Sequence, residues 1–408
     1  MQEKTLCRVC GGLVREFVDF GRQPMADAFV EPGQLADDFV YRLAVGVCAV
    51  CSMAQLIEEV PNELMFHEEY PYRSSGSAVM RAHFAQIARQ FMDRELRGPD
   101  PLIVEIGSND GIMLNTIASA GLRHVGVEPC DNLARLAERN GLSVVNRYFG
   151  QETAERIAAE HGSADVIFSA NTFSHISDVD GVMRGIDALL SKTGVFVFED
   201  PYLLDIVDQT SFDQIYDEHV YFFAAKSISA LAARYGFELV DAERLAVHGG
   251  EVRYSIARAG VRPPTPSVQA LIAMEDLRGL TDEATLRRFA VNTARRRDEL
   301  VDVLHGLKAR GKTIVGYGAT AKSATVLNYC GIGPGLLDFI CDSTPAKQGR
   351  YTPGSHIPVR APEHFVEARP DYALMLAWNH ASEIMEKESW FTEGGGRWIR
   401  YVPEVSLI

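Results

Sequence analysis

The sequence lacks a long hydrophobic run, because none reaches the roughly 18 apolar residues that a membrane-spanning helix requires. It begins MQEKTLC, without the charged and then apolar layout of a signal peptide. Basic residues are scarce, with 40 Lys and Arg against 55 Asp and Glu and a net charge of −15. Such an acidic surface repels phosphate backbones. We therefore expect a cytoplasmic protein that binds neither membranes nor nucleic acids.

Cysteine is infrequent, and an odd number of seven argues against a disulfide framework. Four of the seven form two C-x2-C pairs, Cys7 with Cys10 and Cys48 with Cys51. Two thiolate pairs of this spacing complete a tetrahedron around Zn²⁺, and four thiolates leave no open coordination position. The sequence therefore predicts a structural four-cysteine zinc site, for which four unrelated buried cysteines are the alternative.

The chain divides into segments of different patterning, which together predict an α/β fold. Residues 1–62 hold the cysteine pairs and form the expected zinc-binding module. Residues 63–262 alternate helical patterns with short apolar strands, which is typical of a Rossmann-like parallel sheet with covering helices. Residues 263–311 begin with a Pro-rich stretch and predict a helical connector. Residues 312–408 predict a second Rossmann-like α/β domain.

A glycine-containing loop, residues 105–111 (EIGSNDG), joins the first strand of the central segment to a helix. A carboxylate at Glu128, which ends the next strand, can accept hydrogen bonds from ribose hydroxyls. A dinucleotide site would need G-x-G-x-x-G, whose third glycine is absent. S-adenosylmethionine is cationic at sulfur and carries no phosphate, so the acidic loop favours it; a purely structural turn is the alternative. The expected cofactor-binding residues are Glu105, Gly107, Asn109, Asp110, Gly111, Glu128 and Asn171.

Two histidines lie where catalytic groups are common. His175 follows the fourth predicted strand, at the sheet edge where open α/β sheets present their ligand loops. His219 ends the segment 216–219 (YDEH), directly after Glu218. Histidine titrates near neutral pH and suits general-base catalysis. A lone histidine is more often structural, however, and Glu218 with His219 could form a salt-bridged loop.

Two further motifs complete a set of five that follow one another along the chain. These motifs are the cysteine pairs and the segments 105–111, 216–219, 248–253 (HGGEVR) and 316–323 (GYGATAKS). With this set the chain resembles the zinc-containing sugar C-methyltransferases of antibiotic deoxysugar biosynthesis, and the resemblance runs from Cys7 to the C-terminus. It implies that residues 63–262 are an S-adenosylmethionine-dependent methyltransferase domain. The implied reaction is methylation of C-3′ of a dTDP-4-keto-deoxyhexose.

The resemblance also implies which residues are catalytic. A sugar carbon beside a ketone becomes a nucleophile once a base removes its hydrogen, because the charge moves to the ketone oxygen as an enolate. His219 is the implied base, and Tyr216 and Glu218 hold the substrate or polarise the site. His175 and Tyr70 match two further active-site positions, although for Tyr70 aromatic packing under the zinc module is the alternative.

The C-terminal domain is implied to grip the nucleotide sugar together with the methyltransferase domain. The loop 316–322 precedes a predicted helix, and backbone amides at a helix N-terminus attract phosphate. The implied substrate-binding residues are Tyr72, Arg253, Thr320, Ala321, Lys322 and Lys347. We expect a monomer or a small homo-oligomer.

Other activities remain open from the sequence. The loop 316–322 and Asp342, which ends the next strand, could serve NADPH, although the third glycine is absent here too. The chain would then be an NADPH-dependent 4-ketoreductase of the same dTDP-sugar, alone or as a second activity. A methyltransferase acting on oxygen or nitrogen and a non-catalytic zinc module are the remaining alternatives.

Overall fold

The computed structural model describes residues 5–34, 39–66 and 70–408. Residues 1–4 and 35–38 of the expected zinc module, and 67–69 just before Tyr70, lie outside the described residues. The described chain forms three sheets of four, seven and six strands. In this part of the chain, no helix combines the length and the apolarity that crossing a membrane would need.

The first sheet is antiparallel and draws on two distant parts of the chain. Its strands, in spatial order, are β1 (Val14–Pro24), β2 (Val40–Cys48), β3 (Ala54–Leu56) and β9 (Tyr221–Phe222). In the register of the last pair, Ala54 lies opposite Phe222 and Gln55 opposite Tyr221. The N-terminal sheet is therefore completed by residues from the central segment.

The second sheet has the order β10-β11-β8-β7-β4-β5-β6. Its strands are β4 (Leu102–Ile106), β5 (Arg123–Val127), β6 (Val144–Val145), β7 (Ala164–Ala170), β8 (Leu190–Pro201), β10 (Phe237–Leu245) and β11 (Glu251–Arg258). Every residue of β4 is buried, as expected for a central parallel strand covered on both faces. The helices of this segment are α1 (Asn62–Met65), α2 (Ala78–Arg94), α3 (Ile112–Ser119), α4 (Asp131–Arg139), α5 (Gln151–His161), α6 (Val179–Leu189), α7 (Leu203–Gln209) and α8 (Ala225–Arg234).

The second sheet is mixed, whereas the sequence pattern predicts a parallel one. Strand β11 runs antiparallel to both β8 and β10. The connection between β10 and β11 is short, and a parallel pair would need a long crossover. This reversal places Glu251, the first residue of β11, opposite Pro201 at the end of β8. A residue from the start of one strand thus reaches the edge where the parallel strands end.

The third sheet has the order β14-β13-β12-β15-β16-β17. Its strands are β12 (Ile314–Tyr317), β13 (Ile340–Cys341), β14 (Val359–Arg360), β15 (Tyr372–Met375), β16 (Arg397–Arg400) and β17 (Ser406–Leu407). Its helices are α11 (Ala321–Tyr329), α12 (Glu363–Ala368), α13 (Ala381–Lys387) and α14 (Ser389–Glu393). Two helices, α9 (Pro266–Leu277) and the long α10 (Glu283–Ala309), precede it.

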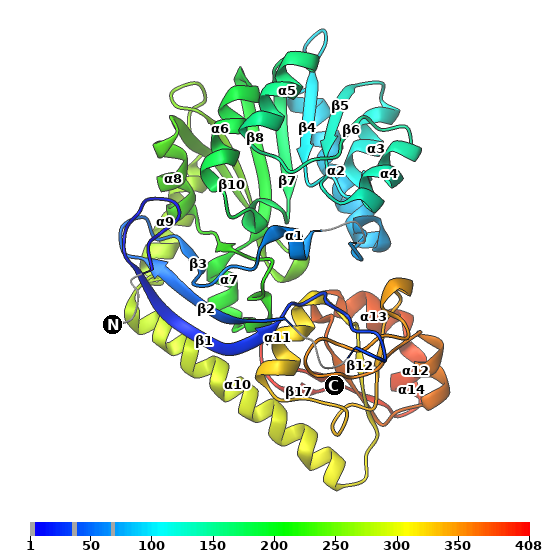
Figure 1. Cartoon of the computed structure of the whole chain (residues 1–408). Coiled ribbons are helices and arrows are strands. Elements are labelled where there is room, and N and C mark those ends of the chain that lie inside the picture. The colour runs from blue at the N-terminus through cyan, green and yellow to red at the C-terminus, as the bar shows by residue number, and fades with distance from the viewer. Residues whose placement is uncertain (1–4, 35–38, 67–69) are drawn as a thin grey trace.

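The N-terminal sheet joins the two α/β units. Figure 1 shows β1 and β2, in blue, passing between the central unit above and the long helix α10 and the C-terminal unit below. The ring of Phe20 in β1 lies 6.2 Å from that of Phe212 in the central unit and 5.0 Å from that of Tyr329 in α11. The first sheet is therefore part of the contact between the other two.

Candidate active site

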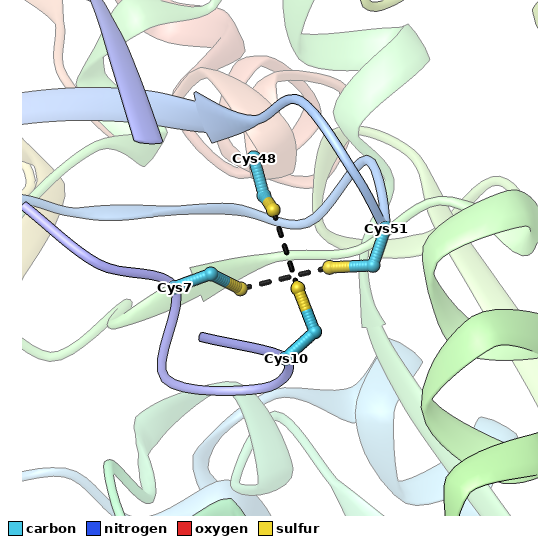
Figure 2. A group of neighbouring side chains, drawn as sticks. All are labelled: Cys7, Cys10, Cys48 and Cys51. Atoms are coloured by element: carbon cyan, nitrogen blue, oxygen red, sulfur yellow. Dashed lines mark hydrogen bonds between the residues drawn. The ribbon is translucent and has the colours of Figure 1, made fainter. Parts of the chain in front are cut away.

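The four paired cysteines converge at one end of the N-terminal sheet (Figure 2). Cys7 and Cys10 flank a turn before β1, Cys48 ends β2, and Cys51 lies in the turn that leads to β3. Their four sulfurs all lie within 4.8 Å of one another. Two pairs are closer, with 3.6 Å between Cys7 Sγ and Cys51 Sγ and 3.4 Å between Cys10 Sγ and Cys48 Sγ.

This donor set fits zinc. A tetrahedral site with Zn–S bonds of about 2.3 Å separates its sulfurs by about 3.8 Å, close to the distances seen here. Backbone amides support the sulfurs, since Gly12 N–H donates to Cys10 Sγ and Val50 N–H to Cys48 Sγ, each at 3.4 Å. Four thiolates and no open position are typical of structural zinc sites.

The loop 105–111 has the tight backbone that its glycines allow. Gly107 has a φ of +70°, and a Cβ there would overlap the side chain of Thr172. The amide of Asn109 donates to Glu128 Oε2 at 2.9 Å, and that of Cys130 donates to Glu128 Oε1 at 2.9 Å. Glu128 therefore orients the loop and the start of α4 with its two carboxylate oxygens.

Two acidic side chains of this loop have buried oxygens without a hydrogen-bond partner among the described residues. These atoms are Glu105 Oε2 and Asp110 Oδ1. The other oxygen of Asp110 accepts from the Ser75 hydroxyl at 2.5 Å. Burial raises the pKa of Glu105 well above its usual range, and the neighbouring Asp110 and Glu128 raise it further. The free oxygens of Glu105 and Asp110 fit a ligand with an ammonium group, because a nearby positive charge favours the ionised carboxylate and counteracts the raised pKa.

Asn171 lies at the end of the neighbouring strand β7, in a left-handed backbone conformation with a φ of +48°. Its amide donates to the carbonyl of Glu199 at 2.7 Å. Beside it lies Glu251, which is fully buried, and neither of its carboxylate oxygens makes a hydrogen bond of good geometry with the described residues. Burial raises the pKa of Glu251 well above its usual range, although the side chain of Asn171 acts in the opposite direction.

His219 has a defined hydrogen-bond partner. Its Nδ1 lies 2.7 Å from the carbonyl oxygen of Gln214, which can only accept, so Nδ1 carries the proton. The neutral ring then has its lone pair at Nε2. Burial lowers the pKa of His219 well below its usual value of 6.5, and the neighbouring His175 and Lys322 lower it further. The imidazole is therefore held neutral, in the state of a base.

Glu218 lies beside the histidines and is hydrogen-bonded to a tyrosine. The Tyr70 hydroxyl donates to Glu218 Oε2 at 3.1 Å. His175 Nδ1 lies 4.0 Å from the same oxygen, and the rings of His175 and His219 are 5.1 Å apart. Burial raises the pKa of Glu218 well above its usual range. It lowers the pKa of His175 to about 3, so both side chains favour their neutral forms.

Tyr216 completes this group of side chains. Its ring centre lies 4.3 Å from that of His219. It packs in a small apolar cluster with Ala26 from the N-terminal module and Ala324 from α11. The structure thus brings together the five residues expected to be catalytic, Tyr70, His175, Tyr216, Glu218 and His219, where the three parts of the chain meet.

The C-terminal loop presents Thr320, Ala321 and Lys322 at the start of α11. Thr320 caps the helix, because its hydroxyl oxygen accepts from the Ser323 amide. Lys322 Nζ lies 3.3 Å from the carbonyl oxygen of His248 and 5.7 Å from the centre of the Trp378 ring. Burial lowers the pKa of Lys322, while Asp213 and Glu251 act in the opposite direction.

Two other residues expected to bind substrate already have strong partners within the chain. Arg253 Nε donates to Glu199 Oε1 at 2.6 Å, and its Nη1 donates to Glu243 at 2.8 Å. Lys347 Nζ donates to Asp27 Oδ1 at 2.9 Å and to the carbonyl oxygen of Ala319 at 3.0 Å. Tyr72, in contrast, is 45% exposed.

The NADPH alternative depends on Asp342, whose two side-chain oxygens accept from backbone amides. Asp342 Oδ2 accepts from Ala319 and Oδ1 from Thr344, each at 2.7 Å. Asp342 thus orients the loop 316–322, as Glu128 orients the loop of the central unit. The NADPH alternative itself stays a prediction.

Sequence reasoning missed several members of the site. Asp27 has no motif around it, and His83, whose Nε2 lies 2.6 Å from Glu199 Oε2, is one polar residue of a helix. The partner of His219 is the backbone of Gln214, which no side chain could reveal. Glu251 alone had a signal, because it lies inside the motif 248–253.

Comparison with known proteins assigns all three parts of the chain. Family models match for a zinc binding domain over residues 7–66, a methyltransferase domain over 80–242 and a C-methyltransferase C-terminal domain over 246–403. The C-methyltransferase NovU of Streptomyces niveus is 36% identical over 406 residues, which cover 98% of this chain and 96% of NovU.

More distant proteins match parts of the chain. The ubiquinone biosynthesis O-methyltransferase of a Methylobacterium species (strain 4-46) is 26% identical over 126 residues, 29% of this chain and 49% of that protein. The crystal structure of magnesium protoporphyrin IX methyltransferase from Synechocystis PCC 6803 covers 45% of this chain and 88% of its own, with 10% identity and a TM-score of 0.35.

The match to NovU extends over nearly the whole chain, and the four-cysteine cluster is present where the zinc-domain model matches. The expected α/β fold with an N-terminal four-cysteine cluster is confirmed, as is an S-adenosylmethionine-dependent methyltransferase that acts on carbon. The chain belongs to the zinc-containing C-methyltransferase family.

Proposed function

We propose that this C-methyltransferase deprotonates C-3′ of a dTDP-4-keto-deoxyhexose and methylates the enolate carbon, in deoxysugar biosynthesis for an antibiotic. The observation that carries the proposal is the state of His219. Its Nδ1–H donates to the Gln214 carbonyl and its pKa is lowered, so Nε2 is an unprotonated base in a buried site. Methylation of a carbon next to a ketone needs such a base, whereas a heteroatom nucleophile has its own lone pair.

The first step is transfer of the C-3′ proton to His219 Nε2. The electron pair of the C–H bond becomes part of the enolate, and the negative charge lies on the C-4′ oxygen. A positioned general base contributes about 10²- to 10⁴-fold in rate. An O–H donor near that oxygen would stabilise the charge as it develops. We assign this role to the neutral carboxyl group of Glu218, which accepts from the Tyr70 hydroxyl and has its own O–H to donate. The Tyr70 hydroxyl has one hydrogen and would act as the donor only by turning it from Glu218 to the substrate oxygen.

The residues around the glycine loop would hold the methyl donor. We assign Glu128 to the ribose hydroxyls and the free oxygens of Glu105 and Asp110 to the ammonium group. When bound there, S-adenosylmethionine supplies the electrophilic methyl group for the enolate carbon.

Glu128→Ala tests this assignment of the methyl-donor site. We expect a loss of roughly 10- to 150-fold in S-adenosylmethionine affinity, because a hydrogen bond to a charged group contributes about 1.5–3 kcal/mol. Isothermal calorimetry measures the affinity, and melting curves check that the loop, which Glu128 also orients, still folds. The control is Asp131→Ala, which removes a nearby carboxylate that pairs with Arg135 on the surface of α4. Equal affinities for wild type and Glu128→Ala would place the cofactor elsewhere.

For the diphosphate of the nucleotide sugar, we propose the start of α11. Thr320 and Ala321 offer backbone amides at the N-terminus of a nine-residue helix, and such amides attract phosphate. Lys322 adds a positive charge near the acidic side chains of Asp213 and Glu251. An anionic ligand can bind there although the chain has a net charge of −15.

The proposed substrate is tested by offering a panel of dTDP-4-keto sugars with S-adenosylmethionine. We expect one member of the panel to gain a single methyl group in place of a hydrogen by mass spectrometry, and NMR should place this methyl on C-3′. The matched control is the same sugar reduced to a 4-hydroxyl, which has no acidic C-3′ hydrogen and should not react. Methylation of the reduced sugar, or a methyl group on oxygen or nitrogen, would contradict the proposal.

A further inference from the structure

The catalytic segment 214–219 is hydrogen-bonded to the N-terminal module on one side and to the C-terminal unit on the other. On one side the amide of Ala26, in the N-terminal module, donates to Asp217 Oδ1 at 3.1 Å. On the other side the hydroxyl of Thr325, in α11, donates to the carbonyl of Ile215 at 2.7 Å. The methyltransferase unit therefore presents these residues in a segment whose position depends on the other two units.

A buried ion pair joins the same two units beside this segment. Lys347 Nζ lies 2.9 Å from Asp27 Oδ1, and the two side chains are 8% and 13% exposed. The ammonium also donates to the Ala319 carbonyl at 3.0 Å and lies 4.6 Å from the centre of the Phe29 ring. Two of its three donors are used and an aromatic face is in contact, so this cation is bound by the protein itself.

The ion pair lies close enough to Glu218 to act on its charge. Asp27 follows Ala26, which is bonded to Asp217, the residue before Glu218. Asp27 raises the pKa of Glu218, as Asp217 does, and Lys347 lowers it.

Other polar groups around Glu218 are neutral or act through hydrogen bonds. Tyr70 donates to its carboxyl group, and His175 Nδ1 lies 4.0 Å away. Tyr41 and Cys130 are farther members of its surroundings, and burial raises the pKa of both, which keeps them uncharged. Among the described residues, Asp27, Asp217 and Lys347 are thus the charged groups that act on Glu218.

We propose that Asp27 and Lys347 are positioning residues, a buried ion pair that holds the catalytic segment between the outer units and sets the electric field at Glu218. This inference rests on the proposed role of Glu218 and replaces the expected contact of Lys347 with diphosphate. A buried pair of this kind is sensitive to loss of one partner, since the other charge then stays buried and uncompensated.

The test is a double-mutant cycle of Lys347→Met, Asp27→Asn and the double variant in the full-length enzyme. We expect each single variant to lower kcat for methyl transfer by about tenfold or more, with KM for the sugar within about threefold of wild type. The double variant should be more active and more stable than Lys347→Met, because no unpaired charge remains. The conservative control Lys347→Arg keeps the cation and should retain more activity than Lys347→Met.

The titration of Glu218 gives a reading that needs no substrate. Loss of a nearby cation raises the pKa of a carboxyl group and loss of a nearby anion lowers it. We therefore expect the Glu218 titration to move to higher pH in Lys347→Met and to lower pH in Asp27→Asn. Carbon NMR of glutamate-labelled enzyme follows this titration, and Glu218→Gln assigns the signal.

Two results would overturn the proposal. One is a higher KM for the sugar and weaker dTDP binding in Lys347→Met with kcat unchanged, since that pattern marks a phosphate ligand. The other is a Glu218 titration that does not move in opposite directions in the two single variants. If wild type methylates no sugar of the panel, only the proposed function fails. The Glu218 titration and the stabilities of wild type, the two single variants and the double variant then still decide the role of the ion pair.

Discussion

His219→Asn is expected to lose two activities together: exchange of the C-3′ hydrogen with D₂O and methyl transfer. Asparagine fills much of the same space but has no basic nitrogen, so the proton has no acceptor. The loss should reach about 10²- to 10⁴-fold, the usual contribution of a general base. Binding of dTDP-sugar should remain, because the proposed diphosphate contacts lie in α11. Exchange is measured by NMR or mass spectrometry with S-adenosylhomocysteine in place of the methyl donor.

Matched variants separate the base from its neighbours. Tyr216→Phe and Glu218→Gln should retain partial activity, since these residues orient and polarise. His175→Asn is the control for a rival base, because its ring lies 5.1 Å from that of His219 and its Nε2 has no partner among the described residues. If His175→Asn abolishes exchange and His219→Asn keeps it, the two roles are exchanged. If both keep it, Tyr70 becomes the candidate base.

The pH dependence of exchange follows from the lowered pKa of His219. A histidine whose folded-state pKa lies well below 6.5 is still mostly unprotonated at pH 6.5. The exchange rate of wild type should therefore stay level as the pH falls from neutral to 6.5 and decline only at lower pH. A decline centred at or above pH 6.5 would mean that the base has an ordinary or raised pKa.

Local patterns were sufficient to predict the parts of the fold that depend on neighbouring residues. The mostly apolar run at residues 102–106, directly before a glycine turn, predicts a strand, and β4 covers the same residues. The run at residues 337–341 (LDFIC) likewise predicts a strand, but in the structure β13 begins only at Ile340. The two C-x2-C pairs likewise fix the ligands of their site by spacing alone.

Long-range partners were beyond sequence reasoning. Strand β9 has only two residues, Tyr221 and Phe222, and is a strand because β3 pairs with it across the chain. Arg253 was expected to meet diphosphate, yet register places it opposite Glu199, to which it is bonded. The Asp27–Lys347 pair joins residues from opposite ends of the sequence, and no local pattern marks either. The sequence thus predicts residues for the catalytic roles, but it does not predict the groups that hold those residues in place.

Cys48→Ser should destabilise the protein before it changes any single catalytic step. Binding of structural zinc contributes about 10–16 kcal/mol in small zinc peptides, whereas a whole domain is stable by about 5–15 kcal/mol. Loss of one thiolate should therefore unfold the N-terminal module. Metal analysis should find about one zinc per wild-type chain and less in the variant, and calorimetry should show a lower melting temperature or an early separate transition.

The zinc module pairs with residues close to His219, so unfolding of this module should also lower the activity. Cys48 ends β2 and Cys51 lies in the turn to β3, and β3 pairs with β9, which begins two residues after His219. Where Cys48→Ser remains folded, at low temperature, it should keep most of its turnover. The control is Cys330→Ser, a buried cysteine outside the cluster, which should keep full zinc content. A Cys48→Ser variant as stable as wild type but inactive would show that the zinc takes part in the chemistry, because a structural site affects turnover only through the fold that it holds.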